Sequence, residues 1–222
     1  MHLPYINRSE AARLLAEALQ PYAGRSDVLI LGLPRGGVPV AYEVAQTLKA
    51  SLDLMLVRKL GVPGHEELAM GAIATGGIRV LNAEVIERLG ISDAEIERVA
   101  AREQQELQRR DRVYRGHRPP PDMEGRCVIL VDDGLATGAT MRSAIAAVRR
   151  QKPARLVVAV PVAPLRTVAR LREEADEVVC PATPEPFFSI GRWYEDFTPV
   201  TDEDVRVLLE QAWREQPEQA EA

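Results

Sequence analysis

A thirteen-residue string, VILVDDGLATGAT at 128–140, constrains this chain more than any other stretch. Its first four residues are apolar and predict a buried strand, and two carboxylates, Asp132 and Asp133, follow directly. A short turn with Gly and Thr then leads into a helix that we expect to begin near Met141. Ligands of open α/β sheets bind at the edge where such strands end. The string therefore predicts a ligand site as well as a strand and a helix.

The residue types in this string indicate the kind of ligand. Adjacent carboxylates can accept charge-assisted hydrogen bonds from neighbouring hydroxyls of a sugar. Backbone N–H groups at a helix N-terminus, joined by threonine hydroxyls, make a site for a phosphate monoester. Five consecutive residues are placed for that role: Ala136, Thr137, Gly138, Ala139 and Thr140. Together these features favour a ribose 5-phosphate, and the alternative is an ordinary acidic turn that caps a helix.

The rest of the chain alternates strand-like and helix-like runs. This pattern predicts an α/β fold with an open, mainly parallel sheet and helices on both faces. With 222 residues, of which 46% are hydrophobic, the chain can build one domain around a core, so we treat 1–222 as a single domain. The core strands are expected at 27–33, 52–57, 128–131, 155–162 and 177–180.

Several classes of protein are disfavoured by the composition. We find neither a secretion signal nor a run of about 18 apolar residues, so we expect a cytoplasmic protein without a membrane partner. The net charge of −5 gives no general attraction for nucleic acid. Cys127 and Cys180 lie in apolar runs, which favours buried thiols over a disulfide or a metal pair.

Two further segments are expected at the same edge of the sheet. The first is Pro34-Arg35-Gly36-Gly37, between a strand and a helix at about 38–50, where the glycines would let N–H groups close on an anion. The second is Arg58 and Lys59, which follow the expected strand 52–57 and could neutralise a leaving diphosphate. Taken alone, each has a simpler explanation, a plain glycine turn and a pair of solvated charges.

An insertion at about 82–125 is predicted to form a helical arm. Ser92 and Glu95 make a capping box for a long helix that reaches about Tyr114. The end of the arm is rich in arginine: Arg109, Arg110, Arg112, Arg115 and Arg118. One interpretation is a solvated face that complements the helix dipole. The other is an arm that folds over the site and contacts phosphates.

The segment 181–222 contains an aromatic stretch and the last helix. Phe188, Trp193 and Tyr194 belong to a Pro-rich, irregular run that could stack on a heterocyclic acceptor. The alternative is that these aromatics fill the core below the last helix.

The string 128–140 resembles the phosphoribosyl diphosphate (PRPP) signature of type I phosphoribosyltransferases. The segment 34–37 resembles the diphosphate loop of that family, where an unusual backbone turn, often with a non-proline cis peptide, points amides at the diphosphate. The resemblance implies a phosphoribosyltransferase-like fold and transfer of 5-phosphoribosyl from PRPP to a nitrogen acceptor with release of diphosphate. It also implies Mg²⁺, held mainly by PRPP and in part by Asp132 and Asp133. A homodimer is compatible with this family.

The same resemblance implies roles for individual residues. Asp132 and Asp133 would hold the ribose, and Lys59 would approach the diphosphate. The remaining diphosphate ligands would be Arg35, Gly36, Gly37 and Arg58. Ala136 stands where relatives that use 6-oxopurines carry an acid, which disfavours those acceptors.

Many relatives close a mobile loop over PRPP and bring a cation with it. Here the corresponding loop, expected at 61–67, has none, because no Lys or Arg lies between Lys59 and Arg79. This departure favours one alternative, a PRPP-binding regulator or sensor without turnover. A separate alternative is a hydrolase that uses Asp133 as a base on another phosphate ester.

Overall fold

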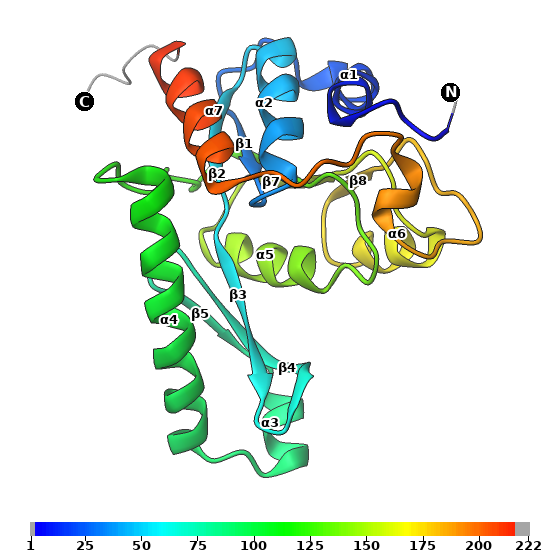
Figure 1. Ribbon diagram of the computed structural model, residues 1–222. Coiled ribbons are helices and arrows are strands. Elements are labelled where there is room, and N and C mark those ends of the chain that lie inside the picture. Colours follow the sequence, from blue (N-terminus) through cyan, green and yellow to red (C-terminus); the bar gives the residue numbers. More distant parts are fainter. Residues whose placement is uncertain (1–2, 216–222) are drawn as a thin grey trace.

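A computed structural model describes residues 3–215 and is built on a parallel five-stranded sheet (Figure 1). The strand order is β2-β1-β6-β7-β8, and all four strand pairs are parallel. This confirms the predicted α/β architecture. The strands are β1 (Val28–Gly32), β2 (Ser51–Leu54), β6 (Cys127–Val131), β7 (Arg155–Ala159) and β8 (Glu177–Val179).

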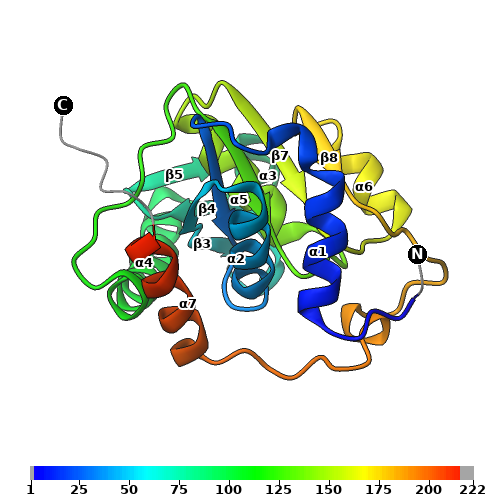
Figure 2. The same cartoon turned by 90° about the horizontal axis from the view of Figure 1, so that it is seen from above.

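Helices cover both faces of this sheet (Figures 1 and 2). One face carries α1 (Arg8–Ala18), α2 (Gly37–Leu48) and α7 (Asp202–Glu215), and the other carries α5 (Ala139–Arg150) and α6 (Leu165–Leu171). Two short 3₁₀ helices lie at Gln20–Tyr22 and Ile190–Trp193. Within residues 3–215, no helix combines the length and the hydropathy needed to cross a membrane.

The core forms because successive strand residues point to opposite faces. In β1, Val28 and Ile30 pack into the cluster under α1 and α2, while Leu29 and Leu31 pack into the cluster over α5. All five residues of β1 are buried. A strand buried on both faces has a continuous apolar sequence, which is why the apolar run located it although the run has no alternating pattern.

A second, antiparallel sheet projects from the main one (Figure 1). It contains β3 (Val57–Val62), β4 (His65–Ala74) and β5 (Ile78–Leu81). Helices α3 (Ala83–Leu89) and α4 (Asp93–Arg115) pack on it, and the capping box at the start of α4 is present. We call β3–β5 with α3 and α4 the arm. It begins at Val57, so the expected insertion at 82–125 supplies only its helical part.

The structure corrects two expectations about the chain between 52 and 67. The expected strand 52–57 is interrupted, because β2 ends at Leu54 and the chain then leaves the main sheet to form β3. Arg58 and Lys59 therefore lie within β3, not at the end of a core strand. The expected loop 61–67 is the tip of the β3–β4 hairpin, which lies at the end of the arm far from the main sheet (Figure 1).

A buried ion pair fastens the end of α4 to the main sheet. The Arg115 Nη2 atom lies 2.7 Å from the Asp53 Oδ1 atom, and both side chains are almost fully buried. The same nitrogen donates to the carbonyl oxygen of Leu54 at 2.6 Å. The basic end of α4 is thereby held beside the C-terminal edge of β2.

Candidate functional site

Two predicted loops meet at the C-terminal edge of the adjacent strands β1 and β6. Gly32 and Val131 are register partners at the ends of these strands. The Leu33 N–H group continues the pairing by donating to the Val131 carbonyl at 2.9 Å. The segment 34–37 then follows β1, and Asp132 and Asp133 follow β6. Edges of this kind are where ligands of open α/β sheets bind.

The two glycines of segment 34–37 let the loops touch. A Cβ atom on Gly36 would lie 2.0 Å from the Asp133 Oδ2 atom, and one on Gly37 would lie 2.7 Å from the Val131 carbonyl oxygen. Neither distance leaves room for a side chain. The preceding peptide bond, between Pro34 and Arg35, is cis. The loop thus packs directly against the two aspartates, as a site that combines both loops requires.

The two aspartates differ in their surroundings. Asp132 is half-buried, and its Oδ1 atom accepts the Asp133 N–H at 2.9 Å. Burial raises the pKa of Asp132 well above its usual value, and repulsion from Asp133 raises it further. Burial also raises the pKa of Asp133, but the Arg8 guanidinium opposes that effect. The pKa values of both carboxyl groups are therefore raised, and only that of Asp133 is opposed mainly by a neighbouring cation.

Arg8, at the start of α1, is a site residue that the sequence did not reveal. Its Nε atom donates to the Asp133 Oδ2 atom at 2.9 Å, and its Nη1 atom donates to the Thr198 carbonyl at 2.9 Å. The guanidinium also lies over the Phe197 ring, 4.0 Å from its centroid. No local pattern could have identified it, because its partners lie far away in the chain.

The segment 136–140, which the sequence predicts to bind a phosphate, forms a turn at the start of α5. Gly138 adopts a positive φ of 74° directly before α5, which starts at Ala139. The side chains of Thr137 and Thr140 are exposed at this end of the helix. The loop is fixed from α6, because the Thr167 hydroxyl donates to the Ala136 carbonyl at 2.7 Å. Thr167 is a second supporting residue for which the sequence offered no signal.

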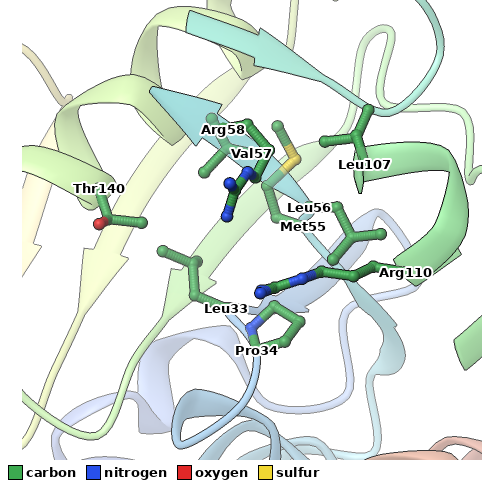
Figure 3. A pocket seen from close by; sticks show the side chains of 9 residues that line it. All are labelled: Leu33, Pro34, Met55, Leu56, Val57, Arg58, Leu107, Arg110 and Thr140. Carbon is green, nitrogen blue, oxygen red and sulfur yellow. The ribbon is translucent and has the colours of Figure 1, made fainter. Parts of the chain in front are cut away.

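The predicted cations near the diphosphate loop have different positions. Arg58 forms an ion pair with Glu103 of α4, at 2.6 Å between Nη2 and Oε2. It also lines a small cavity of about 30 Å³ together with Pro34 and Thr140 (Figure 3). Lys59 follows Arg58 in β3, so its side chain points to the opposite face of that strand. Arg35 is exposed, with Asp202 of α7 3.8 Å away.

The aromatic residues predicted on the acceptor side are divided. Tyr194 is buried, stacks on Phe197 with ring centroids 5.0 Å apart, and donates its hydroxyl to the Asp133 carbonyl. Trp193 is half-buried against Phe187. Phe188 is 69% exposed. Tyr194 therefore packs against the turn that contains Asp132 and Asp133. Of the three aromatic rings, Phe188 is the one that a ligand can reach.

Asp132 and Asp133 supply oxygen ligands, which Mg²⁺ prefers. Among the described residues, no group of three or more His, Cys, Asp or Glu side chains is placed to hold a metal ion. The donor set fits a Mg²⁺ ion that keeps most of its ligands from a bound diphosphate and from water.

Comparisons with known proteins identify the family. The family model for the phosphoribosyl transferase domain matches residues 6–192. The solved structure of TT1426 from Thermus thermophilus is 46% identical and has a TM-score of 0.86, with 94% of this chain and 99% of that chain covered.

Two curated relatives, from two strains of Mycobacterium tuberculosis, carry names that assign them provisionally to the phosphoribosyl transferases. Each is 46% identical over 209 residues, which cover 94% of this chain and 47% of the relative. The chain thus spans about half the length of the curated relatives that it matches. The family model covers most of the chain, which therefore belongs to the type I phosphoribosyl transferase family.

Proposed function

We propose that this chain transfers the 5-phosphoribosyl group from PRPP to a nitrogen acceptor and releases diphosphate. The observation that carries the proposal is the contact between the two loops. Gly36 and Gly37 bring segment 34–37 against the aspartate turn with no space for a Cβ atom. A ligand with a sugar at the aspartates and a diphosphate at segment 34–37 would fit both loops at once.

In this proposal each loop binds one part of PRPP. The N–H groups at the start of α5, with Thr137 and Thr140, hold the 5-phosphate. Asp132 and Asp133 accept hydrogen bonds from the ribose hydroxyls. Asp133 is only 7% exposed and its Oδ2 atom accepts from Arg8, so a sugar hydroxyl would use the remaining lone pairs of this carboxylate.

The chemistry then depends mainly on position and charge. As the bond from the anomeric carbon to the diphosphate breaks, positive charge develops on the ribose and negative charge on the leaving group. Donors aimed at the leaving diphosphate stabilise this state more than the bound substrate. We assign that role to segment 34–37 with Arg58, which lines the cavity beside Pro34, and not to Lys59, which points to the opposite face of β3. A Mg²⁺ ion held by the diphosphate, with Asp132 and Asp133 nearby, would neutralise further charge.

The acceptor is a base or an amine with a free nitrogen. Ala136 offers no carboxylate to a 6-oxopurine, so hypoxanthine, guanine and xanthine are disfavoured. Phe188, which is 69% exposed, is the aromatic ring that we place on the acceptor side.

The ribose assignment is tested by changing both aspartates to Asn. Asn keeps the size of the side chain but loses the charge, and charge-assisted hydrogen bonds are about twice as strong as neutral ones. We expect the affinity for PRPP with Mg²⁺ to fall by about a hundredfold in the double variant, measured by calorimetry. Unchanged affinity would remove the aspartates from the ribose site.

Turnover is tested separately with a panel of bases and amines. The purified protein is mixed with PRPP and Mg²⁺, and diphosphate release is followed for each acceptor. We expect release to depend on one class of acceptor. Binding of PRPP without release for any acceptor would make the chain a PRPP-binding protein instead of an enzyme. Phosphate release from simple phosphate esters would favour a hydrolase.

A further inference from the structure

The arginines at the end of α4 and just after it have different surroundings. Arg115 is buried against Asp53, and Arg118 lies over the Trp213 ring at 4.8 Å from its centroid. Arg112 is exposed on the helix surface. Arg109 and Arg110 differ from these three, because both line a cavity next to segment 34–37.

This cavity lies between three elements and has a volume of about 350 Å³. Segment 34–37, α4 and the first turn of α7 contribute its walls. It is lined by Pro34, Arg35, Arg109, Arg110, Tyr114 and Asp202. The volume is large compared with the share of one water molecule, about 30 Å³ in the liquid, so a small polyanion can enter.

A second, smaller cavity of about 30 Å³ lies beside this one and reaches Thr140. Pro34 and Arg110 line both cavities, and the smaller one also contacts Arg58 and Thr140. Figure 3 shows Arg58 from β3 and Arg110 from α4 reaching into the same space, with Thr140 on its far side. Arg58 and Arg110, two cations of the arm, therefore lie between Thr140 and segment 34–37.

The charges around the larger cavity favour an anion. Arg35, Arg109 and Arg110 line it, against the single carboxylate of Asp202, which already accepts a hydrogen bond from the Tyr114 hydroxyl at 2.7 Å. Glu106 lies one turn earlier in α4 and orients both helix arginines, through Nε contacts of 2.8 Å to Arg109 and 2.7 Å to Arg110. A guanidinium carries five donors, so Arg110 keeps further N–H groups for a ligand.

We propose that Arg109 and Arg110 of α4 bind the diphosphate end of PRPP opposite Arg35 and segment 34–37. The inference rests on the proposed function, since it names residues that hold the same substrate. The tip of the β3–β4 hairpin carries no Lys or Arg, and in this proposal Arg109 and Arg110 of α4 supply those charges instead. Because α4 is fastened by Arg115 to Asp53 and by Tyr114 to Asp202, these arginines are in place before the ligand binds.

The test compares ligands that do and do not reach this cavity. Affinities for PRPP, inorganic diphosphate and ribose 5-phosphate are measured by calorimetry with Mg²⁺, for the wild type, R110Q and R109Q/R110Q. Hydrogen bonds to charged groups lead us to expect a tenfold to hundredfold loss, roughly, for PRPP and diphosphate in the double variant, and a smaller loss in R110Q. Affinity for ribose 5-phosphate should not change, because it has no diphosphate.

R112Q is the matched control. It removes the same charge from the same helix, but Arg112 does not line either cavity. We expect it to bind all three ligands as the wild type does. All variants change only exposed or half-buried side chains, so each should fold. The unfolding midpoint of each variant checks this.

Failure of this inference and failure of the proposed function give different results. If the wild type binds PRPP and R109Q/R110Q binds it equally well, the arginine assignment is wrong and the transferase proposal stands. If the wild type binds diphosphate but not PRPP, and the double variant loses diphosphate, the arginines form an anion site and the transferase proposal is wrong. A wild type that binds neither ligand overturns both.

Discussion

Gly36 is the residue at which the two loops depend most directly on each other. Its position has no room for a Cβ atom, which would lie 2.0 Å from the Asp133 carboxylate oxygen. The Gly36→Ala variant must therefore displace either segment 34–37 or Asp133. We expect at least about a tenfold loss of PRPP affinity, because a displacement of about 1 Å in a site commonly has effects of this size or larger. Calorimetry measures it.

Gly64 provides the control for this change. It lies at the tip of the β3–β4 hairpin with a positive φ of 78° and no atom within 4 Å of the added Cβ. Gly64→Ala should lower stability by about 1 kcal/mol through backbone strain and leave PRPP affinity unchanged. Equal effects of the two variants on PRPP binding would show that Gly36 has no special role.

The negative charge of Asp132 lowers the free energy of unfolding, and this effect can be measured. Its pKa is raised by burial and by Asp133, so the folded protein binds the proton more tightly than the unfolded chain does. Folding is therefore penalised at high pH, and the penalty disappears as the pH falls to the usual pKa of 3.8.

We expect Asp132→Asn to raise the free energy of unfolding at pH 8 by on the order of 1 kcal/mol. Asn keeps the oxygen that accepts the Asp133 N–H and carries no charge at any pH. The gain should shrink steadily towards low pH, as measured by urea unfolding at several pH values. A gain that is the same at every pH would assign the effect to packing instead of charge.

At the scale of elements, the position of α4 depends on the ion pair between Arg115 and Asp53. Both side chains are buried, so removing one leaves the other charge without a partner in a poorly solvated place. Asp53→Ala should lower the free energy of unfolding by about 3–5 kcal/mol, measured by urea denaturation.

The pair Arg25 and Asp27 is the control for Asp53→Ala. Its Nη2 to Oδ2 distance is also 2.7 Å, but both side chains are exposed. Asp27→Ala should therefore have a far smaller effect, because solvent screens exposed ion pairs. Similar losses in the two variants would mean that burial does not determine the strength of the Arg115 anchor.

At the scale of the whole molecule, the proposals join three segments that are far apart in the chain. These are segment 34–37, the loop 132–140 and the second half of α4. We expect added PRPP to slow amide hydrogen exchange in all three segments. A bound ligand makes local opening of the segments that it contacts less frequent, and amides exchange from the opened form. Strand β8, at the far edge of the sheet, is the internal reference.

Hydrogen exchange read by mass spectrometry makes this comparison. Slower exchange in the two loops without any change in α4 would contradict the role of Arg109 and Arg110. It would leave the assignment of the loops intact.

The local features of this protein could be read from its sequence. The strands, the helices of the main sheet and the capping box of α4 follow from apolar runs and short motifs, which depend on near neighbours in the chain. The approach of segment 34–37 to the aspartate turn also followed, because parallel strands bring their carboxyl ends to one edge. The course of the chain after Leu54 did not, since an apolar run does not show which sheet it joins.

The sequence by itself thus determined the sheet, the edge at which we propose that the ligand binds, and the residue types that line that edge. Only the tertiary structure decided how distant side chains pair there. Arg8 meets Asp133 across 125 positions of the chain, and Arg115 meets Asp53 across 62. It also decided which arginines of α4 are buried and which face the cavity. Such contacts depend on the packing of whole elements in space, which no local pattern of residues records.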